Sequence, residues 1–169
     1  MFRETDAIKD GKIADKGALS GIKVLDLTRY LSGPQTTLFL GALGAEVLKI
    51  DNPHQGDPVR NSPPFFGKNG VSMSKASPLD IGIAYLKRAR SKKSIELDLK
   101  SEDGINTFMR LAEKADVIVE NFRVGVTNRL KIDYEQLKLK NPKILILYLV
   151  FLQKLIQIMN FGKKNVIRS

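Results

Sequence analysis

Short apolar runs recur along this chain, separated by segments in which apolar residues follow helical spacing. Four of the runs contain β-branched residues and are bounded by charged or turn-forming residues, which is typical of buried strands. The predicted strands cover residues 22–27, 46–51, 94–99 and 116–120, and a further strand is expected to start within 144–147.

The segment after the first strand predicts a helix over residues 36–43. Ser32 or Gly33 is suited to cap this helix, Pro34 suits its first turn, and Gly44 is expected to end it. A strand, a tight loop, a helix and a second strand within about 30 residues form the βαβ unit of a parallel sheet.

Two further helices are predicted. One begins after Ser101, a favourable N-cap followed by two acids, and runs to about Lys114. A short one covers residues 134–139. Residues 52–78 are rich in Pro, Gly, Ser and Asn, which predicts a long functional or mobile loop, and residues 81–86 suit either a short helix or an extended segment.

The alternation of strands and helices predicts an α/β fold with a Rossmann-like, mostly parallel sheet. Ligands of such sheets bind beyond the carboxyl ends of the strands. The segments that follow the predicted strands are residues 28–33, residues 52–56, Lys100 and residues 121–125. We therefore expect these segments to cluster.

Composition excludes several kinds of chemistry. The chain of 169 residues contains no cysteine, which excludes disulfides, thiolate catalysis and cysteine-ligated metals. The single histidine, His54, lies in a turn-like stretch and is interpreted as a surface residue, so no metal site is expected. The polar residues 1–20 lack the apolar run of a secretory signal, which predicts a loose arm and a cytoplasmic protein.

The net charge of +10 arises mainly at one end of the chain. Residues 136–169 contain seven basic side chains and no acid, whereas residues 1–135 contain 21 basic and 18 acidic side chains. No aromatic-interleaved basic motif is present, so a specific nucleic-acid partner is not expected. The apolar run at 144–152 is too short to span a bilayer. An amphipathic tail helix on an anionic membrane surface is the alternative for this segment.

Five sequence blocks follow one another at natural spacing: GIKVLDLTRYLSGP, LGAEVLKID, RSKKSIELDLKSEDG, ADVIVENFRVGVTNRL and YEQLKLKNP. Over roughly residues 20–145 they resemble the N-terminal part of the class III CoA-transferases, which include formyl-CoA transferase and the carnitine and bile-acid CoA-transferases. The α-methylacyl-CoA racemases share this fold. The resemblance implies an incomplete, Rossmann-like portion of the family fold that binds coenzyme A, and a homodimer of interlocked ring-shaped subunits.

The resemblance also implies which residues contact coenzyme A: Leu31, Ser32, Leu97, Asp98, Leu99, Lys100, Asn121, Phe122, Arg123 and Arg129. Arginine and lysine suit the phosphates of the coenzyme, and Asn121 suits the polar edges of its adenine or pantetheine. For the charged members of this set, solvated surface positions remain the alternative.

Two other groups of charged residues allow more than one interpretation. Arg88, Arg90, Lys92 and Lys93 form a basic run before the third strand, and in the family such a run lies near the coenzyme. A solvated sheet edge explains the run equally well. Asp26, near the end of the first strand, is interpreted as a structural group that fixes the loop before the helix rather than as a catalytic base.

The transferases of this family use an aspartate nucleophile, which attacks an acyl-CoA and then carries the CoA to a carboxylic acid. That aspartate lies downstream of the Asn-Pro block, as does the His and Asp pair of the racemases. After Glu135 this chain contains no acid, and a Ser-Gly-Phe-Gly-like turn is missing. We therefore expect no catalytic residue here, an inactive chain, and a reading frame that shifts or ends near residues 144–151.

The sequence thus predicts a polar arm at 1–20, a partial Rossmann-like CoA-binding domain at 21–147 and a basic apolar tail at 148–169. The expected substrates of the intact family are an acyl-CoA and a carboxylic acid. One alternative is a non-catalytic CoA-binding module or half of a two-chain enzyme, and another is a fragment of an α-methylacyl-CoA racemase. Exposed apolar strands of a partial domain predict poor soluble expression.

Overall fold

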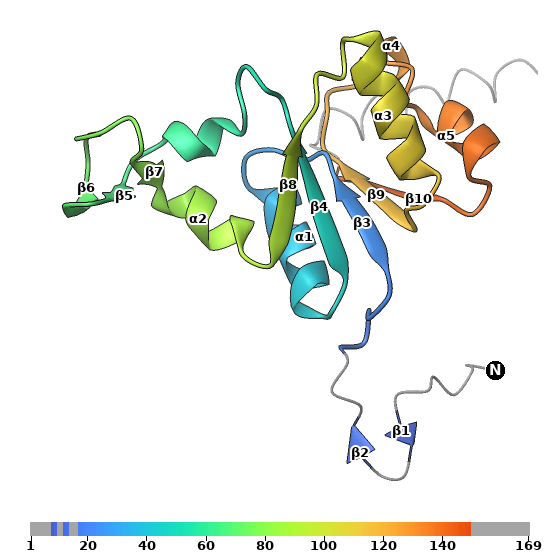
Figure 1. Ribbon diagram of the computed structural model, residues 1–169, viewed down its shortest axis with the longest axis horizontal. Coiled ribbons are helices and arrows are strands. Elements are labelled where there is room, and N and C mark those ends of the chain that lie inside the picture. The colour runs from blue at the N-terminus through green and yellow to red at the C-terminus, as the bar shows by residue number, and fades with distance from the viewer. Residues whose placement is uncertain (1–7, 10–11, 14–16, 150–169) are drawn as a thin grey trace, which may run out of the picture.

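A parallel sheet of five strands forms the centre of the protein in the computed structural model, which describes residues 8–9, 12–13 and 17–149. The strand order is β10-β9-β3-β4-β8 (Figure 1). The strands are β3 (Lys23–Asp26), β4 (Glu46–Asp51), β8 (Lys92–Glu96), β9 (Val117–Glu120) and β10 (Leu145–Tyr148). The predicted α/β class with a mostly parallel sheet is confirmed.

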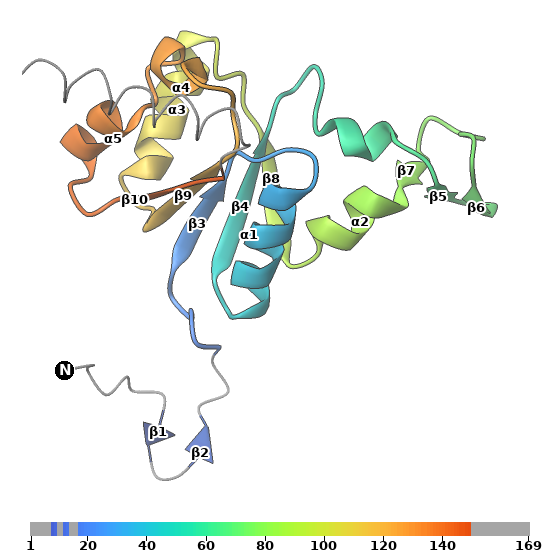
Figure 2. The ribbon, with the colours of Figure 1, turned by 180° about the vertical axis from the view of Figure 1, so that it is seen from behind.

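Helices cover both faces of this sheet (Figures 1 and 2). The first face is covered by α1 (Ser32–Ala42), and α2 (Ile83–Ala89) lies beside α1. The second face is covered by α3 (Glu102–Ala112) and α5 (Tyr134–Lys140). The short α4 (Val126–Arg129) lies beyond the end of β9.

The start of α1 differs from the prediction. Leu31 occupies the N-cap position, without a side-chain hydrogen bond, and Ser32 is already helical. The first turn of the helix packs closely on the segment that follows β3, because a Cβ atom on Gly33 would overlap the Thr28 side chain. Gly44 follows the helix with φ +103°, as the prediction of a glycine stop requires.

The boundaries of β8 were also predicted incorrectly. The strand pairs with β4 from Lys92 to Glu96, and the chain then leaves the sheet. The apolar alternation continues to Leu99 because Leu97 and Leu99 pack against the core. The apolar spacing at these two positions therefore reflects burial of their side chains and does not indicate a strand.

The segment 52–78, predicted as a long loop, contains regular structure. The segment contains a short 3-10 helix, η1 (Pro58–Asn61), and two strands, β5 (Phe65–Gly67) and β6 (Gly70–Ser72). A third strand, β7 (Ile81–Gly82), follows the segment. The three strands form an antiparallel ribbon that extends away from the main sheet (Figure 1). Two buried carboxylates organise the segment, because Asp57 caps η1 and Asp80 accepts hydrogen bonds from two backbone N–H groups.

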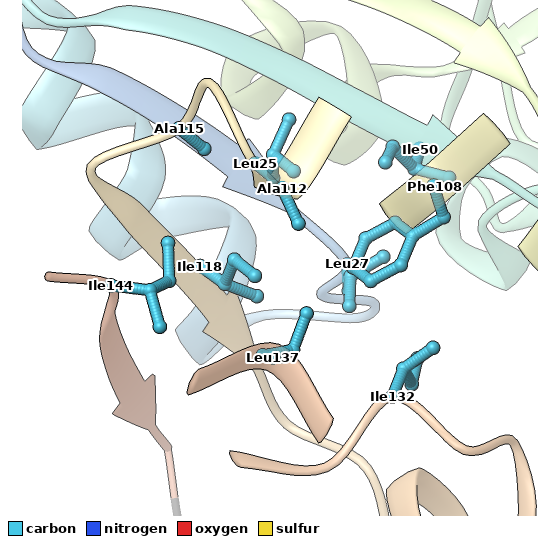
Figure 3. Packing of buried hydrophobic residues seen from close by; sticks show 10 residues of the cluster. All are labelled: Leu25, Leu27, Ile50, Phe108, Ala112, Ala115, Ile118, Ile132, Leu137 and Ile144. Atoms are coloured by element: carbon cyan, nitrogen blue, oxygen red, sulfur yellow. The ribbon is translucent and has the colours of Figure 1, made fainter. Parts of the chain in front are cut away.

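The main hydrophobic core lies between the sheet and the helices α3 and α5 that cover its second face (Figure 3). Its buried members are Leu25, Leu27, Ile50, Phe108, Ala112, Ala115, Ile118, Ile132, Leu137 and Ile144. A smaller cluster under α1 includes Val24, Val47 and Val119, and Leu19 packs against it. Residues 8–9 and 12–13 form a pair of two-residue strands, β1 (Ile8–Lys9) and β2 (Lys12–Ile13). The tail after residue 149 lies outside the described residues.

We predict that Phe108→Ala lowers the free energy of unfolding by about 3–5 kcal/mol, because Phe108 is fully buried at the centre of the larger cluster. Chemical denaturation monitored by circular dichroism measures this loss. Phe39→Ala is the matched control, since Phe39 is 59% exposed on α1 and its truncation should change stability by about 0.5 kcal/mol or less. Equal losses in the two variants would contradict this packing.

Candidate functional site

A cavity of about 590 Å³ lies at the carboxyl ends of β3, β4 and β8 and beside the chain that leaves β9. Its wall consists of short segments from separate elements: Asn52, His54 and Gln55 after β4, Leu97, Asp98, Leu99 and Lys100 after β8, and Phe122 after β9. The predicted clustering of the strand-end segments is confirmed for these residues. His54 is exposed, as expected for a surface position.

The cavity brings together six of the ten residues predicted to contact a ligand: Leu97, Asp98, Leu99, Lys100, Phe122 and Arg129. The other four predicted residues are not part of its wall. Leu31 and Ser32 are exposed at the start of α1, and Arg123 is exposed after β9. Contact of any of the ten with coenzyme A stays a prediction.

The Asn121 side chain forms hydrogen bonds with the loop between β3 and α1. Its Oδ1 atom accepts a hydrogen bond from the backbone N–H of Arg29 at 3.0 Å, and its Nδ2 atom donates to the carbonyl of Arg29 at 2.8 Å. The amide of Asn121 thus fixes the β3–α1 loop against the end of β9. This bond positions Arg29 at the cavity, and Arg29 was not predicted to belong to the site.

The cavity wall combines positive charge with apolar surface. Arg29, Lys100 and Arg129 supply three cations against the carboxyl groups of Asp51 and Asp98. Phe122 and Leu97 supply flat or apolar surface. Such a wall suits a ligand that carries phosphates at one end and a flat ring or alkyl chain elsewhere.

The turn that follows β8 is held by its own side chains. Asp98 Oδ1 accepts a hydrogen bond from the Lys100 N–H at 3.0 Å. Ser101 Oγ accepts one from the Gly104 N–H at 3.1 Å, which confirms Ser101 as the N-cap of α3. These two bonds fix the backbone that carries Lys100 into the cavity.

The fully buried Asp26 carboxylate organises the loop next to the cavity. Oδ1 accepts hydrogen bonds from the backbone N–H and the hydroxyl of Thr28. Oδ2 accepts from the Thr37 hydroxyl at 2.6 Å and from Lys92 Nζ at 3.0 Å. These contacts agree with the interpretation of Asp26 as a structural group that fixes the loop before α1.

Lys92 is not a solvated edge charge, which was one of the two interpretations of its basic run. Its side chain is only 2% exposed, and Nζ also donates to the Pro34 carbonyl at 2.9 Å. Burial lowers the pKa of Lys92, and the neighbouring Asp26 carboxylate opposes part of this shift. The sequence missed this role because the partner carboxylate lies 66 residues earlier in the chain.

A second buried lysine, Lys49, was also missed. Its Nζ donates to the Thr28 carbonyl at 2.7 Å and lies 3.5 Å from Asp51 Oδ1 and 3.7 Å from Asp57 Oδ2. Lys49 therefore links β4 to the end of β3 and to the start of η1. One sequence feature indicated burial, because Lys49 lies within the predicted buried strand at residues 46–51. In the fold this strand packs against α1.

Asp51 is the last residue of β4 and lines the cavity. Burial raises the pKa of its carboxyl above the ordinary value of 3.8, and the nearby Lys49 opposes this shift. Among the described residues, Asp51 Oδ1 is buried without a hydrogen-bond partner. The carboxylate is thus held at the cavity wall by charge attraction.

Another cavity, of about 440 Å³, lies at the opposite, amino ends of β3, β4 and β8. Lys23, Lys93 and Lys114 contribute to its wall, which is otherwise mainly apolar. None of the ten predicted ligand residues lines this second cavity.

Comparison with known proteins settles the family. The model of CoA-transferase family III matches residues 19–150. This chain belongs to CoA-transferase family III. The resemblance deduced from the five sequence blocks is therefore confirmed.

Individual family members show the same relationship. The alpha subunit of succinyl-CoA–L-malate CoA-transferase from Chloroflexus aurantiacus is 37% identical over 129 residues, which cover 76% of this chain and 28% of that protein. Human succinyl-CoA:glutarate CoA-transferase is 38% identical over 128 residues, 75% of this chain and 26% of that protein. The chain thus spans less than a third of the length of these relatives.

Solved structures support the fold. A CaiB/BaiF family protein from Brucella suis superposes with a TM-score of 0.68 at 34% identity, over 79% of this chain and 33% of that chain. Within residues 8–9, 12–13 and 17–149, no helix is long and apolar enough to cross a membrane. The same described residues contain no group of three or more His, Cys, Asp or Glu side chains arranged to hold a metal ion.

We predict that Lys92→Met lowers the free energy of unfolding by about 3–5 kcal/mol, because it leaves the Asp26 carboxylate buried without its cation. The double variant Asp26→Asn/Lys92→Met should recover part of the loss. Urea denaturation measures both effects. Lys93→Met, which changes an exposed lysine on the same strand, is the control, and a loss equal to that of Lys92→Met would contradict the account.

We predict that Asp51→Asn is more stable than the wild type at neutral pH. The raised pKa means that the folded chain keeps the Asp51 proton at pH values where the unfolded chain has lost it, so ionisation weakens the folded state. The advantage should shrink as pH falls and vanish below the ordinary value of 3.8, where both states are protonated.

Urea denaturation at a series of pH values measures the stability difference between Asp51→Asn and the wild type. Glu46→Gln, which changes an exposed carboxylate at the other end of the same strand, should show little of this pH dependence. A wild type that gains stability over Asp51→Asn as pH rises would show that the sign is wrong.

Proposed function

We propose that this chain forms the CoA-binding part of an acyl-CoA:carboxylate CoA-transferase. The observation that carries the proposal is the cavity at the carboxyl ends of the strands, where Lys100, Phe122 and Arg129 converge from three separate segments. Membership of CoA-transferase family III supports a coenzyme A thioester as the ligand of this cavity.

In this proposal each part of the cavity binds a different part of the coenzyme. Arg129, Lys100 and Arg29 bind the phosphates, because guanidinium and ammonium groups pair with phosphate oxygens. Phe122 and Leu97 offer a surface for the adenine ring. The pantetheine arm then extends along the β3–α1 loop, toward Leu31 and Ser32.

The substrates that we propose are an acyl-CoA and a small carboxylic acid. The names of the two relatives contain succinyl-CoA together with malate or glutarate, which supports a dicarboxylic acid as the acceptor. We further propose that the protein acts as a cytoplasmic homodimer. Both of these expectations rest on the resemblance to the family.

We also propose that the 169 residues alone do not catalyse the transfer. The family reaction passes through an aspartyl intermediate, and no Asp or Glu follows Glu135 in this chain. The described part binds and orients the coenzyme, and the nucleophile would come from residues outside this chain. Coenzyme A binding without turnover is the expected behaviour.

We predict that Arg129→Gln weakens coenzyme A binding about tenfold or more, because one charge-assisted phosphate contact is lost. Isothermal titration calorimetry with the full chain measures the change. The variant should also show a smaller salt dependence of binding, since one fewer cation pairs with phosphate.

Arg110→Gln is the control for Arg129→Gln. It removes the same charge from an exposed arginine on α3 that does not line the cavity, so coenzyme A affinity should stay close to that of the wild type. Equal affinity of Arg129→Gln and the wild type, or no coenzyme A binding by a folded wild type, would contradict the proposed function.

A further inference from the structure

The second cavity, of about 440 Å³, lies at the amino ends of β3, β4 and β8 and has an apolar floor. Leu25 and Leu48 form this floor, because they are register partners on β3 and β4 and both line the cavity. Leu111, near the end of α3, and Ala115, just after it, form an adjoining wall. The volume is within the range of small-molecule sites.

Three lysines from separate segments line the same cavity: Lys23 on β3, Lys93 on β8 and Lys114 after α3. Lys93 is the register partner of Leu48, so it lies directly beside the apolar floor. Lys23 lies two residues before Leu25 on the same strand, and side chains at this spacing point to the same face of a sheet. The rim of the cavity is therefore basic.

The positive charge at the rim is only partly balanced. Among the described residues, Glu46 is the one acid that lines the cavity, so three lysines and one carboxylate give a net charge of +2. Asp116 lies nearby, and its Oδ2 atom accepts a hydrogen bond from the backbone N–H of Lys23 at 2.8 Å. In the part of the chain that the structure describes, no salt bridge joins Lys23, Lys93 or Lys114 to an acid. The cavity therefore attracts an anion.

The apolar floor and the basic rim together define the kind of ligand. A phosphate group could pair with the lysines, but it would leave the surface of Leu25 and Leu48 in contact with water. A neutral alkyl chain would cover this surface and leave the lysines without a partner. A molecule with an alkyl chain and one carboxylate meets both requirements.

This cavity is separate from the proposed coenzyme site. The two cavities lie at opposite ends of β4, whose six residues span about 20 Å. The two sets of lining residues do not overlap. A ligand can therefore occupy one cavity whether the other is filled or empty.

We propose that the cavity at the amino ends of the strands binds an aliphatic monocarboxylate. The alkyl chain packs on Leu25, Leu48 and Leu111, and the carboxylate pairs with Lys93 beside the floor and with the other lysines of the rim. This site goes beyond the proposed function, because it uses none of the residues assigned to coenzyme A.

Titration of the full chain with octanoate, followed by nuclear magnetic resonance of the alanine and leucine methyl groups, tests the site. The methyl signals of Ala115 and Leu48 should shift, whereas those of Leu139, which is exposed on α5, should not. Octanoate should bind about tenfold more tightly than hexanoate, because two more methylene groups leave water. The neutral octanol should bind more weakly than octanoate, and high salt should reduce this difference.

The triple variant Lys23→Gln/Lys93→Gln/Lys114→Gln tests the basic rim. It should weaken octanoate binding about tenfold and leave octanol binding unchanged, because only the carboxylate loses its partners. All three lysines are exposed, so the variant should fold as the wild type does. The matched control replaces three exposed lysines that do not line the cavity: Lys68→Gln, Lys87→Gln and Lys140→Gln.

Leu48→Phe tests the apolar floor. The larger side chain takes up space in the cavity, so octanoate and octanol should both bind about tenfold more weakly. Thermal unfolding followed by circular dichroism shows whether this variant is folded.

Three outcomes would overturn the inference. A folded wild type whose Leu48 and Ala115 signals do not respond to octanoate would show that the cavity takes no such ligand. Equal octanoate affinity of the lysine triple variant and the wild type would show that the rim does not recognise the carboxylate. Displacement of octanoate by coenzyme A would place both ligands in one cavity. By contrast, a chain that binds octanoate here but does not bind coenzyme A would support this inference and contradict the proposed function.

Discussion

The buried carboxylate of Asp26 is the constraint on which the functional end of this protein depends. Lys92 reaches from β8 across β4 to Asp26 on β3, and Thr28 and Thr37 complete the hydrogen bonds of the carboxylate. A carboxylate buried in this way is stable only while its cation and its hydrogen-bond donors stay in place. The network therefore fixes three strands, the β3–α1 loop and the first turn of α1 relative to one another.

The larger cavity lies next to this fixed region. Lys49 extends the network from the Thr28 carbonyl to Asp57 at the start of η1. On the other side, Asn121 holds the backbone of Arg29 at the wall of the larger cavity.

The sequence predicted the parts of the structure that local patterns determine. Residues 46–51 form a strand as their apolar run indicates, Ser101 caps α3, and the strand-end segments meet at one cavity. It could not predict that Lys49 and Lys92 are buried, because lysine is usually exposed and their partners are distant in sequence or on other strands.

The most direct test of the account is hydrogen–deuterium exchange of the full chain with and without coenzyme A. Binding at the carboxyl ends of the strands should slow exchange in the segments 97–100 and 122–130, each of which contributes residues to the wall of the larger cavity. The cavity at the amino ends, with Lys23, Lys93 and Lys114, also offers cations to a phosphate, and its exchange should stay unchanged. Protection confined to that second cavity would contradict the placement of the coenzyme site.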